Sequence, residues 1–211
     1  MLSTYYTAKG SGEHEIIIQK SRFICHISRA STEAEAQAFI QAIKKKHSSA
    51  NHNCSAYLIG ERDEIQKASD DGEPTGTAGI PMLEVLKKRQ LKDTVAVVTR
   101  YFGGIKLGGG GLIRAYGQSV SEGLNHTGIV ERKLMKIMHT KIDYTWLGKL
   151  ENELRSSAYL LKDIHYLEDV EIETYAAADQ TETFTKWMTE LTNGQAKISE
   201  GDVTYLEEEV S

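Results

Sequence analysis

Apolar residues in the first part of the chain occur in short runs that are rich in β-branched side chains. Such runs, bounded by polar or turn-forming residues, are typical of strands. Four of them predict strands at residues 13–18, 22–27, 54–59 and 93–99. Only three polar residues separate the first two runs, which predicts a pair of neighbouring strands.

Apolar residues recur at helical spacing between and after these runs. The pattern predicts a helix from a cap at residues 31–33 to about Lys46, a second from Pro81 to Lys88 with Pro81 in its first turn, and a third from Leu112 to about Asn125. Residues 60–77 are polar and rich in turn formers, which predicts a long exposed loop. We expect one sheet with the helices stacked on one of its faces.

The pattern changes after Gly128. Strand-like and helical segments follow in the order β-α-β-β-α-β, at residues 129–144, 146–159, 160–166, 170–178, 181–191 and 196–206. This order is typical of a ferredoxin-like fold. The sequence therefore predicts an α+β protein of two domains, with a β-α-β sandwich at residues 1–132 and a ferredoxin-like domain at residues 133–211.

The net charge also changes sign near residue 132. The chain has a net charge of -5, but residues 1–132 hold 17 basic and 14 acidic side chains, and residues 133–211 hold 8 and 16. Net charges of +3 and -8 indicate two different surfaces. No secretory leader and no apolar run of membrane-spanning length is visible, and Cys25 and Cys54 lack metal-ligand spacing. We expect a cytoplasmic protein with free thiols and no membrane contact.

The most specific chemistry lies in a glycine-rich segment after the strand at 93–99. Its candidate residues for binding an anion or nucleic acid are Arg100, Tyr101, Phe102, Gly103, Gly104, Lys106, Gly108, Gly109, Gly110 and Arg114. Glycine amides before a helix, basic side chains and aromatic faces suit a phosphate backbone or unpaired bases. The segment matches neither a Walker A motif nor a dinucleotide loop. The same residues would also suit a carboxylate patch on a protein, or a wide turn that lets the next helix pack closely.

A second cluster lies in the predicted loop and contains Asp70, Asp71, Gly72, Glu73, Pro74 and Thr77. Its carboxylates predict either a hard-cation site or a solvated turn, in which Asp71 and Gly72 set the geometry and Thr77 caps the next helix. No spacing ties an acidic pair to a base. We therefore assign no catalytic residue, no metal ligand and no cofactor from the sequence.

His52 and Cys54 lie two residues apart on one predicted strand, so they share a face. A Cys/His nucleophile would need a third, orienting group, and the sequence does not show one. A small buried thiol is the favoured interpretation.

Several stretches closely resemble the Impact family, in particular its bacterial YigZ-like members. They are SDDGEPTGTAGIP at 69–81, VVTRYFGGIKLGGGGLIRAY at 97–116, KSRF at 20–23 and AYLIG at 56–60. The resemblance covers the chain to about Arg132, and the remainder looks like the small appended domain of the bacterial members. It implies an N-terminal fold like domain four of elongation factor G, a C-terminal fold like the last domain of that factor, and a translation-linked role rather than catalysis.

In the eukaryotic members the related domain regulates translation through a protein partner of a stress kinase. Since the chain begins almost directly at the Impact core, we do not expect that role to transfer. The sequence predicts a non-enzymatic protein that contacts RNA or the ribosome through the glycine-rich segment, with a translation-related protein as another partner. Two alternatives stay open: a metal-assisted phosphoryl-transfer or hydrolytic enzyme that uses Asp70, Asp71 and Glu73, and a pure protein-interaction module.

Overall fold

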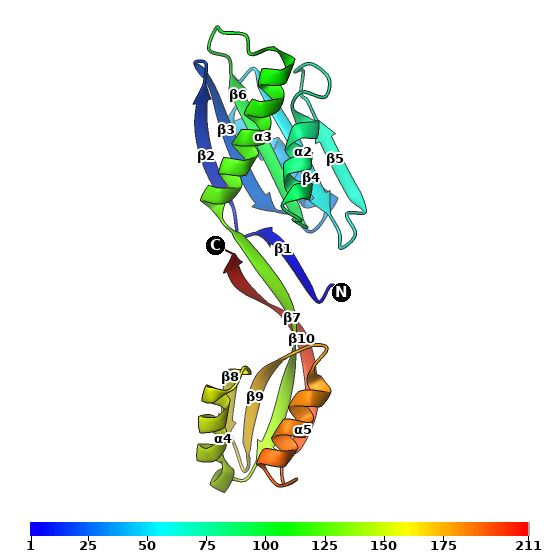
Figure 1. The fold of residues 1–211 in the computed structure, drawn as a ribbon, viewed down its shortest axis with the longest axis vertical. Helices are drawn as coiled ribbons and strands as arrows, with labels where there is room; N and C mark the ends of the chain where they lie inside the picture. Colours follow the sequence, from blue (N-terminus) through cyan, green and yellow to red (C-terminus); the bar gives the residue numbers. More distant parts are fainter. Residues whose placement is uncertain (211) are drawn as a thin grey trace. The chain divides into compact units, whose positions relative to one another are not determined.

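The structure is a computed structural model, and it describes residues 1–210. It divides into two compact units. The larger unit comprises Tyr5–Arg132 and a short segment that begins at Glu208, and the smaller unit comprises Met1–Thr4 and Lys133–Glu207. In Figure 1 the larger unit is coloured mainly from blue to green and the smaller unit from yellow-green to red. None of the described helices is both long and apolar enough to span a bilayer.

The larger unit is built on an antiparallel sheet of five strands in the order β2-β3-β6-β4-β5. The strands are β2 (Gly12–Ile18), β3 (Ser21–Arg29), β4 (His52–Ile59), β5 (Ile65–Ser69) and β6 (Thr94–Tyr101). The central strand β6 is buried along nearly its whole length. The prediction of one long loop at residues 60–77 was wrong, because those residues include the edge strand β5 and the buried Glu73 and Thr77. Four of the five residues of β5 are exposed, which leaves little apolar signal for a strand.

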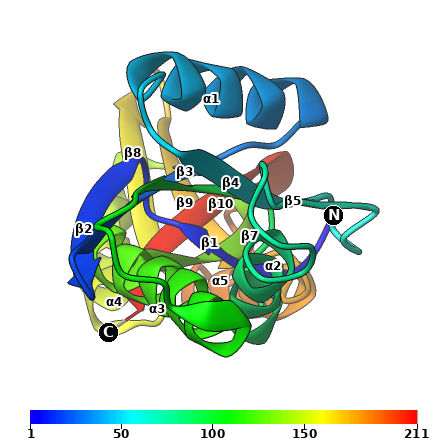
Figure 2. The same cartoon turned by 90° about the horizontal axis from the view of Figure 1, so that it is seen from above.

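Helices cover both faces of this sheet. Helix α1 (Glu33–Lys46) lies on one face, and α2 (Gly79–Lys88) and α3 (Gly108–Thr127) lie on the other (Figure 2). The prediction that all helices share one face was wrong. Along β4, Ala56 and Leu58 join the core under α2 and α3, whereas Tyr57 joins the core under α1. A strand that is apolar at successive positions is buried on both sides, so it needs a covering layer on each.

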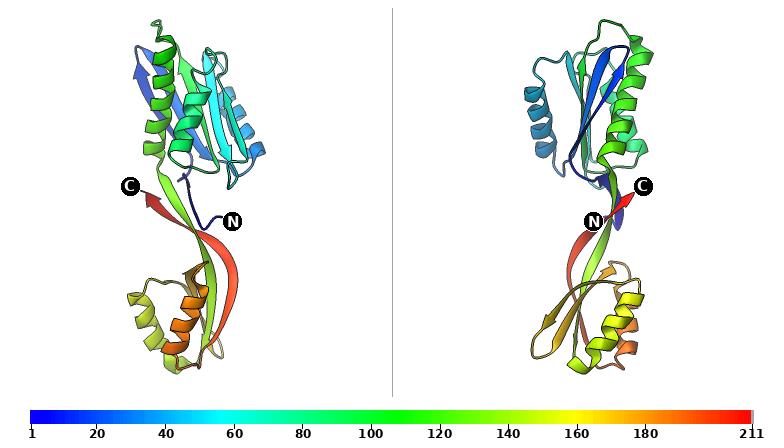
Figure 3. Two further views of the ribbon diagram at one scale, coloured as in Figure 1. Left: turned by 45° about the vertical axis from the view of Figure 1, so that its right-hand side comes forward. Right: turned by 90° about the vertical axis from the view of Figure 1, so that its left-hand side faces the viewer.

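The smaller unit has the predicted β-α-β-β-α-β order. Its elements are β7 (Ile129–Ile142), α4 (Tyr144–Ser156), β8 (Leu160–Tyr166), β9 (Val170–Ala177), α5 (Thr181–Leu191) and β10 (Lys197–Val210). The start of β7, up to Arg132, and the end of β10, from Glu208, belong to the larger unit. Strand β7 pairs with β9 and with β10, and β9 pairs with β8, which is the strand order of a ferredoxin-like fold. Strand β1 (Thr4–Ala8) also pairs with β7. Both helices lie on one side of the sheet (Figure 3), where Leu150 and Phe184 pack on Ile172. The α+β, two-unit architecture is therefore confirmed.

Candidate functional site

Helix α3 begins inside the glycine-rich segment. Gly108 to Gly111 form its first turn, where the sequence predicted a loop. Four glycines in a row are poor helix formers, but the buried residues Leu112, Ala115 and Tyr116 anchor the next turn in the core. The helix has no side-chain cap and no acidic residue in its first turn. Its first amides therefore lack the side-chain partner that a capped helix has.

A cavity of about 380 Å³ adjoins this helix start. Residues of both sequence motifs line it, among them Glu73, Pro74, Arg100, Lys106, Gly108 and Gly109. The first two come from the carboxylate-rich loop and the other four from the glycine-rich segment. The fold thus brings together two motifs that are separate in the sequence.

Arg100 supplies the buried charge of this cavity. Its side chain is only 6% exposed and its Nη1 donates to Glu73 Oε1 over 2.6 Å. The guanidinium lies over the rings of Phe23 and Phe102, at 5.3 and 5.5 Å from their centroids. Its Nε atom has no hydrogen-bond partner among the described residues. Arg100 is thus held in place on two sides, and only part of its hydrogen-bonding capacity is used.

Glu73 is the centre of the polar network beneath the cavity. Tyr116 donates to the same Oε1 atom over 2.8 Å, and His52 Nε2 lies 3.8 Å from Oε2. Burial raises the pKa of the Tyr116 hydroxyl, so it stays a donor. Sequence reasoning missed the role of Tyr116, because a helical apolar position normally indicates core packing.

The three carboxylates of the carboxylate-rich loop have separate partners. Asp70 accepts from the amides of Gly76, Ala78 and Gly79 at 2.8, 3.1 and 2.8 Å, and so caps helix α2. Burial works to raise the pKa of Asp70, but these three amides outweigh it and hold the pKa below its usual value.

Asp71 faces a different partner. Its two oxygens contact Lys44 Nζ at 2.6 Å and the Asn53 amide at 2.7 Å. Asp70, Asp71 and Glu73 therefore point to three different places, and the structure does not support them as one ligand set. The expectation that Thr77 caps α2 was also wrong, because its hydroxyl donates to the Pro74 carbonyl.

Cys54 is a buried thiol, as the sequence favoured. Its Sγ donates to the Asp70 carbonyl over 3.0 Å, and burial raises its pKa to about 12. His52 accordingly serves another purpose, since its Nδ1 donates to the Asp71 carbonyl over 2.9 Å. A thiol with this pKa is not a thiolate at neutral pH, so the pair is not an activated nucleophile.

The remaining candidate residues fall into two groups. Phe102, which is 46% exposed, and Lys106 line the cavity. The basic side chains of Lys106 and Arg114 have no carboxylate partner within residues 1–210. Tyr101 points elsewhere, with its hydroxyl 3.0 Å from His47 Nδ1.

The glycines of the segment also differ in role. A Cβ on Gly103 would lie 2.1 Å from the backbone of Lys20, so this glycine allows two chain segments to approach closely. Gly104 and Gly72 have left-handed backbone angles, with φ of 86° and 87°. Gly110 is exposed in the first turn of α3, with the Arg114 guanidinium beside it.

Comparison with known proteins relates both parts of the chain to described domain families. The Impact N-terminal domain model matches residues 19–124, and a domain of unknown function, DUF1949, matches residues 140–195. The chain is 72% identical over 211 residues to the IMPACT family member YvyE of Bacillus subtilis, covering 100% of this chain and 97% of that protein. It is 45% identical over 109 residues to YigZ of Escherichia coli, covering 51% and 53%.

More distant proteins match as well. The Protein IMPACT homolog of Dictyostelium discoideum is 39% identical over 110 residues, which cover 50% of this chain and 30% of that protein. A crystal structure of a hypothetical protein superposes with a TM-score of 0.61 at 28% identity, covering 94% of this chain and 97% of the other. Since the Impact N-terminal model spans half of the sequence and a relative matches its whole length, the chain belongs to the Impact family.

Proposed function

We propose that this protein is a cytoplasmic, translation-linked binding protein that contacts RNA, alone or in the ribosome, through the cavity at the start of α3. The carrying observation is that an uncapped, all-glycine first helical turn opens on a cavity beside Lys106 and the buried Arg100. The translation-linked role rests on the family resemblance, because the relatives' names state only the family.

The helix start supports an anion as the ligand. The first amides of a helix carry partial positive charge, and they bind phosphate where no side chain covers them. Lys106 adds a full charge at the rim, while the charge of Arg100 is balanced by Glu73. One phosphate of a nucleic-acid backbone is the ligand class that matches this arrangement.

The rim of the cavity supports a nucleic acid rather than a free anion. Phe102 lines the cavity and is 46% exposed, and Ile105 lies next to Lys106 in the chain and is 41% exposed. An exposed aromatic ring next to a phosphate seat offers a stacking surface for an unpaired base. A small inorganic anion would gain nothing from these side chains.

The sharpest test is Gly109→Glu, measured by binding of a labelled single-stranded RNA. A Cβ at this position would meet only Thr77 Cγ2, at 3.9 Å, so the fold accepts a side chain. The new carboxylate interacts favourably with the helix start, by about 0.3–1 kcal/mol, and repels a phosphate there. We expect unchanged or higher stability and RNA binding weakened by at least about 10-fold, since juxtaposed like charges cost several kcal/mol.

Gly148→Glu is the matched control. It introduces the same charge into helix α4, where a Cβ has nothing within 4 Å. RNA binding by this variant should equal that of the parent. If Gly109→Glu also bound RNA like the parent, the helix start would not be the phosphate seat.

Lys106→Ala tests the electrostatic part of the proposal. We expect the slope of log K against log salt to become shallower by about 0.7, the value for one phosphate contact on a single strand. A slope identical to that of the parent would exclude Lys106 from the interface. Arg100→Ala is a poor choice for this purpose, because it would leave Glu73 buried without its partner.

A protein partner is the second candidate. Ile113 on α3 is 45% exposed. Together with Phe102 and Ile105, it gives the glycine-rich segment three exposed apolar side chains that a protein could contact. Pull-down from cell lysate with and without nuclease separates the two candidates. Capture of ribosomal components that nuclease abolishes supports RNA contact, whereas a nuclease-resistant partner that is lost in Phe102→Ala supports the protein interface.

A further inference from the structure

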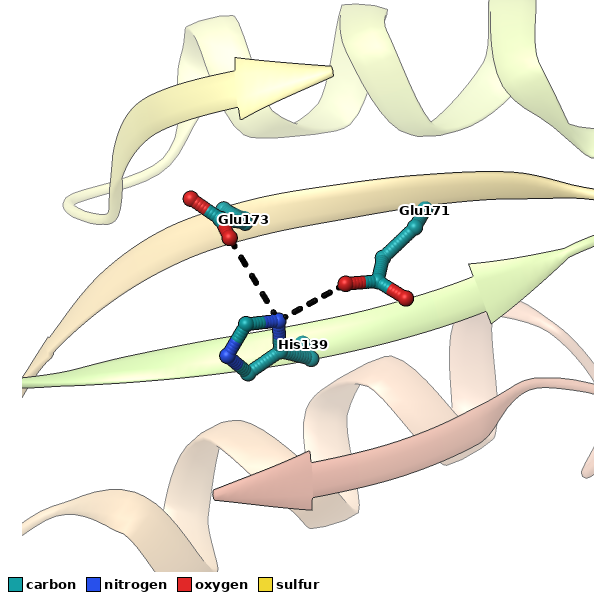
Figure 4. Close-up of side chains that lie close together, drawn as sticks. All are labelled: His139, Glu171 and Glu173. Atoms are coloured by element: carbon teal, nitrogen blue, oxygen red, sulfur yellow. Dashed lines mark hydrogen bonds and ion pairs between the residues drawn. The ribbon is translucent and has the colours of Figure 1, made fainter. Parts of the chain in front are cut away.

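A cluster of histidine and glutamate side chains lies on the smaller unit, on the sheet face opposite α4 and α5. Residues along β9 alternate in direction, and Ile172 packs in the core beneath the helices. Glu171 and Glu173 therefore point to the other face. His139 of β7 is the cross-strand partner of Glu173, and Figure 4 shows its imidazole turned toward both carboxylates.

The ligand-type atoms of this cluster have the separations of a metal site. His139 Nδ1 is 2.9 Å from Glu171 Oε1 and 3.6 Å from Glu173 Oε1. His165 Nε2, on β8, is 3.5 Å from the same oxygen of Glu173. Ligands at about 2.1 Å from a tetrahedral zinc ion lie about 3.4 Å from one another. Within residues 1–210, no other three such side chains bring ligand atoms within 4.8 Å of one another.

Two lysines orient the carboxylates from outside. Lys141 Nζ lies 3.2 Å from Glu171 Oε2, and Lys162 pairs with Glu173 Oε2. Each glutamate is thus held by its Oε2 atom while its Oε1 atom faces His139. Hydrogen-bonded outer partners of this kind are a regular part of metal sites, because they fix the direction of the ligands.

A glycine makes room for the imidazole. A Cβ on Gly201 of β10 would lie 2.3 Å from His139 Nε2, closer than any real contact. The absence of a side chain at this position leaves room for the ring beside Gly201, with its Nδ1 atom toward the glutamates. The orientation of His139 is therefore set by two neighbouring strands and does not depend on the ion pairs alone.

We propose that His139, Glu171 and Glu173 bind a divalent ion of the zinc type, with one coordination position left open to solvent. One imidazole and two carboxylates suit Zn²⁺ or Co²⁺, whereas Mg²⁺ and Ca²⁺ prefer oxygen ligands only. The ligand side chains are 12–27% exposed, which leaves the ion a path from solvent. The site lies on the smaller unit and is independent of the RNA-binding proposal.

The test is calorimetric titration of the full-length, chelator-treated protein with Zn²⁺ in the presence of excess Mg²⁺. We expect saturable binding of one ion, weakened at least about 100-fold in His139→Ala, because even outer partners contribute up to that factor. Co²⁺ bound to the parent should give the intense visible bands of a four-coordinate ion. His126→Ala, an exposed histidine on α3, is the matched control and should bind Zn²⁺ like the parent.

Two further variants keep the proposal testable if His139→Ala fails to fold. Glu173→Gln keeps the size of the side chain and removes an anionic ligand, so it should also weaken binding. Gly201→Ala pushes mainly on the imidazole of His139, and its Cβ would lie 3.2 Å from the Ile137 carbonyl oxygen, so it should lower zinc affinity at a modest cost in stability. No saturable binding by the parent, or equal binding by Glu173→Gln and the parent, would show that the cluster is only a network of ion pairs.

Discussion

Glu73 is a carboxylate with almost no access to solvent, since its side chain is 4% exposed. Its Oε1 atom accepts from both Arg100 and Tyr116, and the charge of Arg100 neutralises it. Removing one partner of such a buried pair typically costs about 3–5 kcal/mol, because the other charge is left without compensation. Gly109 and Lys106 are exposed, so substitutions there leave this buried pair intact.

His26 is a buried histidine whose protonation should destabilise the fold. It lies on β3, 3% exposed, with Nδ1 3.3 Å from Glu13 Oε2 and its ring centroid 5.0 Å from that of His47. Its Nε2 atom has no hydrogen-bond partner within residues 1–210. Burial lowers its pKa to about 4, against the opposing effect of Glu13 and with a further lowering by His47 and Lys46.

This low pKa predicts a loss of stability in mild acid. The unfolded state takes up the proton near pH 6.5 and the folded state only near pH 4, so stability is complete above about pH 6.5 and falls as the pH drops toward 4. Between pH 7 and pH 5 we expect His26 to account for about 2 kcal/mol of lost stability. Hydrogen exchange of β3 amides at the two pH values measures it.

His26→Gln is the comparison, because glutamine does not titrate. Its own stability should change less between pH 7 and pH 5 than that of the parent, whatever its stability at pH 7. If both proteins lost the same amount, the acid sensitivity would belong to other groups.

At the scale of elements, α3 is positioned by glycines that differ in their surroundings. A Cβ on Gly123 would lie 2.6 Å from Cys25 Sγ and 3.0 Å from Cys25 Cβ, both in the core of β3. A Cβ on Gly117 would meet only Val85 Cγ2, at 3.8 Å. The first glycine allows the helix to lie against the sheet, and the second has no such role.

Alanine substitutions should separate these two roles. Gly123→Ala overfills the interface and should destabilise the larger unit by about 1–3 kcal/mol. Gly117→Ala should stabilise it by about 0.5–1 kcal/mol, since alanine favours a helix more than glycine does. Hydrogen exchange of amides in the larger unit measures both changes in the free energy of unfolding. A destabilising Gly117→Ala together with a neutral Gly123→Ala would mean that α3 packs differently.

Local signals were enough for several element boundaries. Thr32 caps α1 by accepting from the Glu35 amide, and Gly128, with φ of 87°, ends α3, both as expected from residue type. The sequence missed β5 and the true start of α3. Strand β5 pairs with β4 but is mostly exposed, so its residues carry little apolar signal, and the glycine turn is stabilised by the buried residues of the helix that continues it.

At the scale of the whole molecule, the two units have separate hydrophobic cores. The clusters around Leu86 and Ile40 belong to the larger unit, and the cluster around Phe184 belongs to the smaller one. Both tryptophans, Trp146 and Trp187, pack against the latter cluster. Tryptophan fluorescence therefore reports on the smaller unit alone.

This arrangement predicts that variants act on one unit at a time. Gly123→Ala should shift the unfolding transition seen by hydrogen exchange in β3 and leave the tryptophan transition unchanged. Separate cores allow separate cooperative transitions. A tryptophan transition that moved in parallel with that of β3 would show that the two units unfold together.

Patterns within the chain were sufficient to predict the two-unit α+β architecture, the ferredoxin-like order of the smaller unit and the two motifs, because these follow from periodicity and residue type. Only the tertiary structure decided which motif residues meet. In the structure Arg100 is a buried partner of Glu73, Asp70 caps helix α2, and Lys106 lines the same cavity as the first glycines of α3. The physical reason is that the burial and the partners of a side chain depend on strands and helices elsewhere in the chain. A local pattern of residue types does not show which of these elements will pack together.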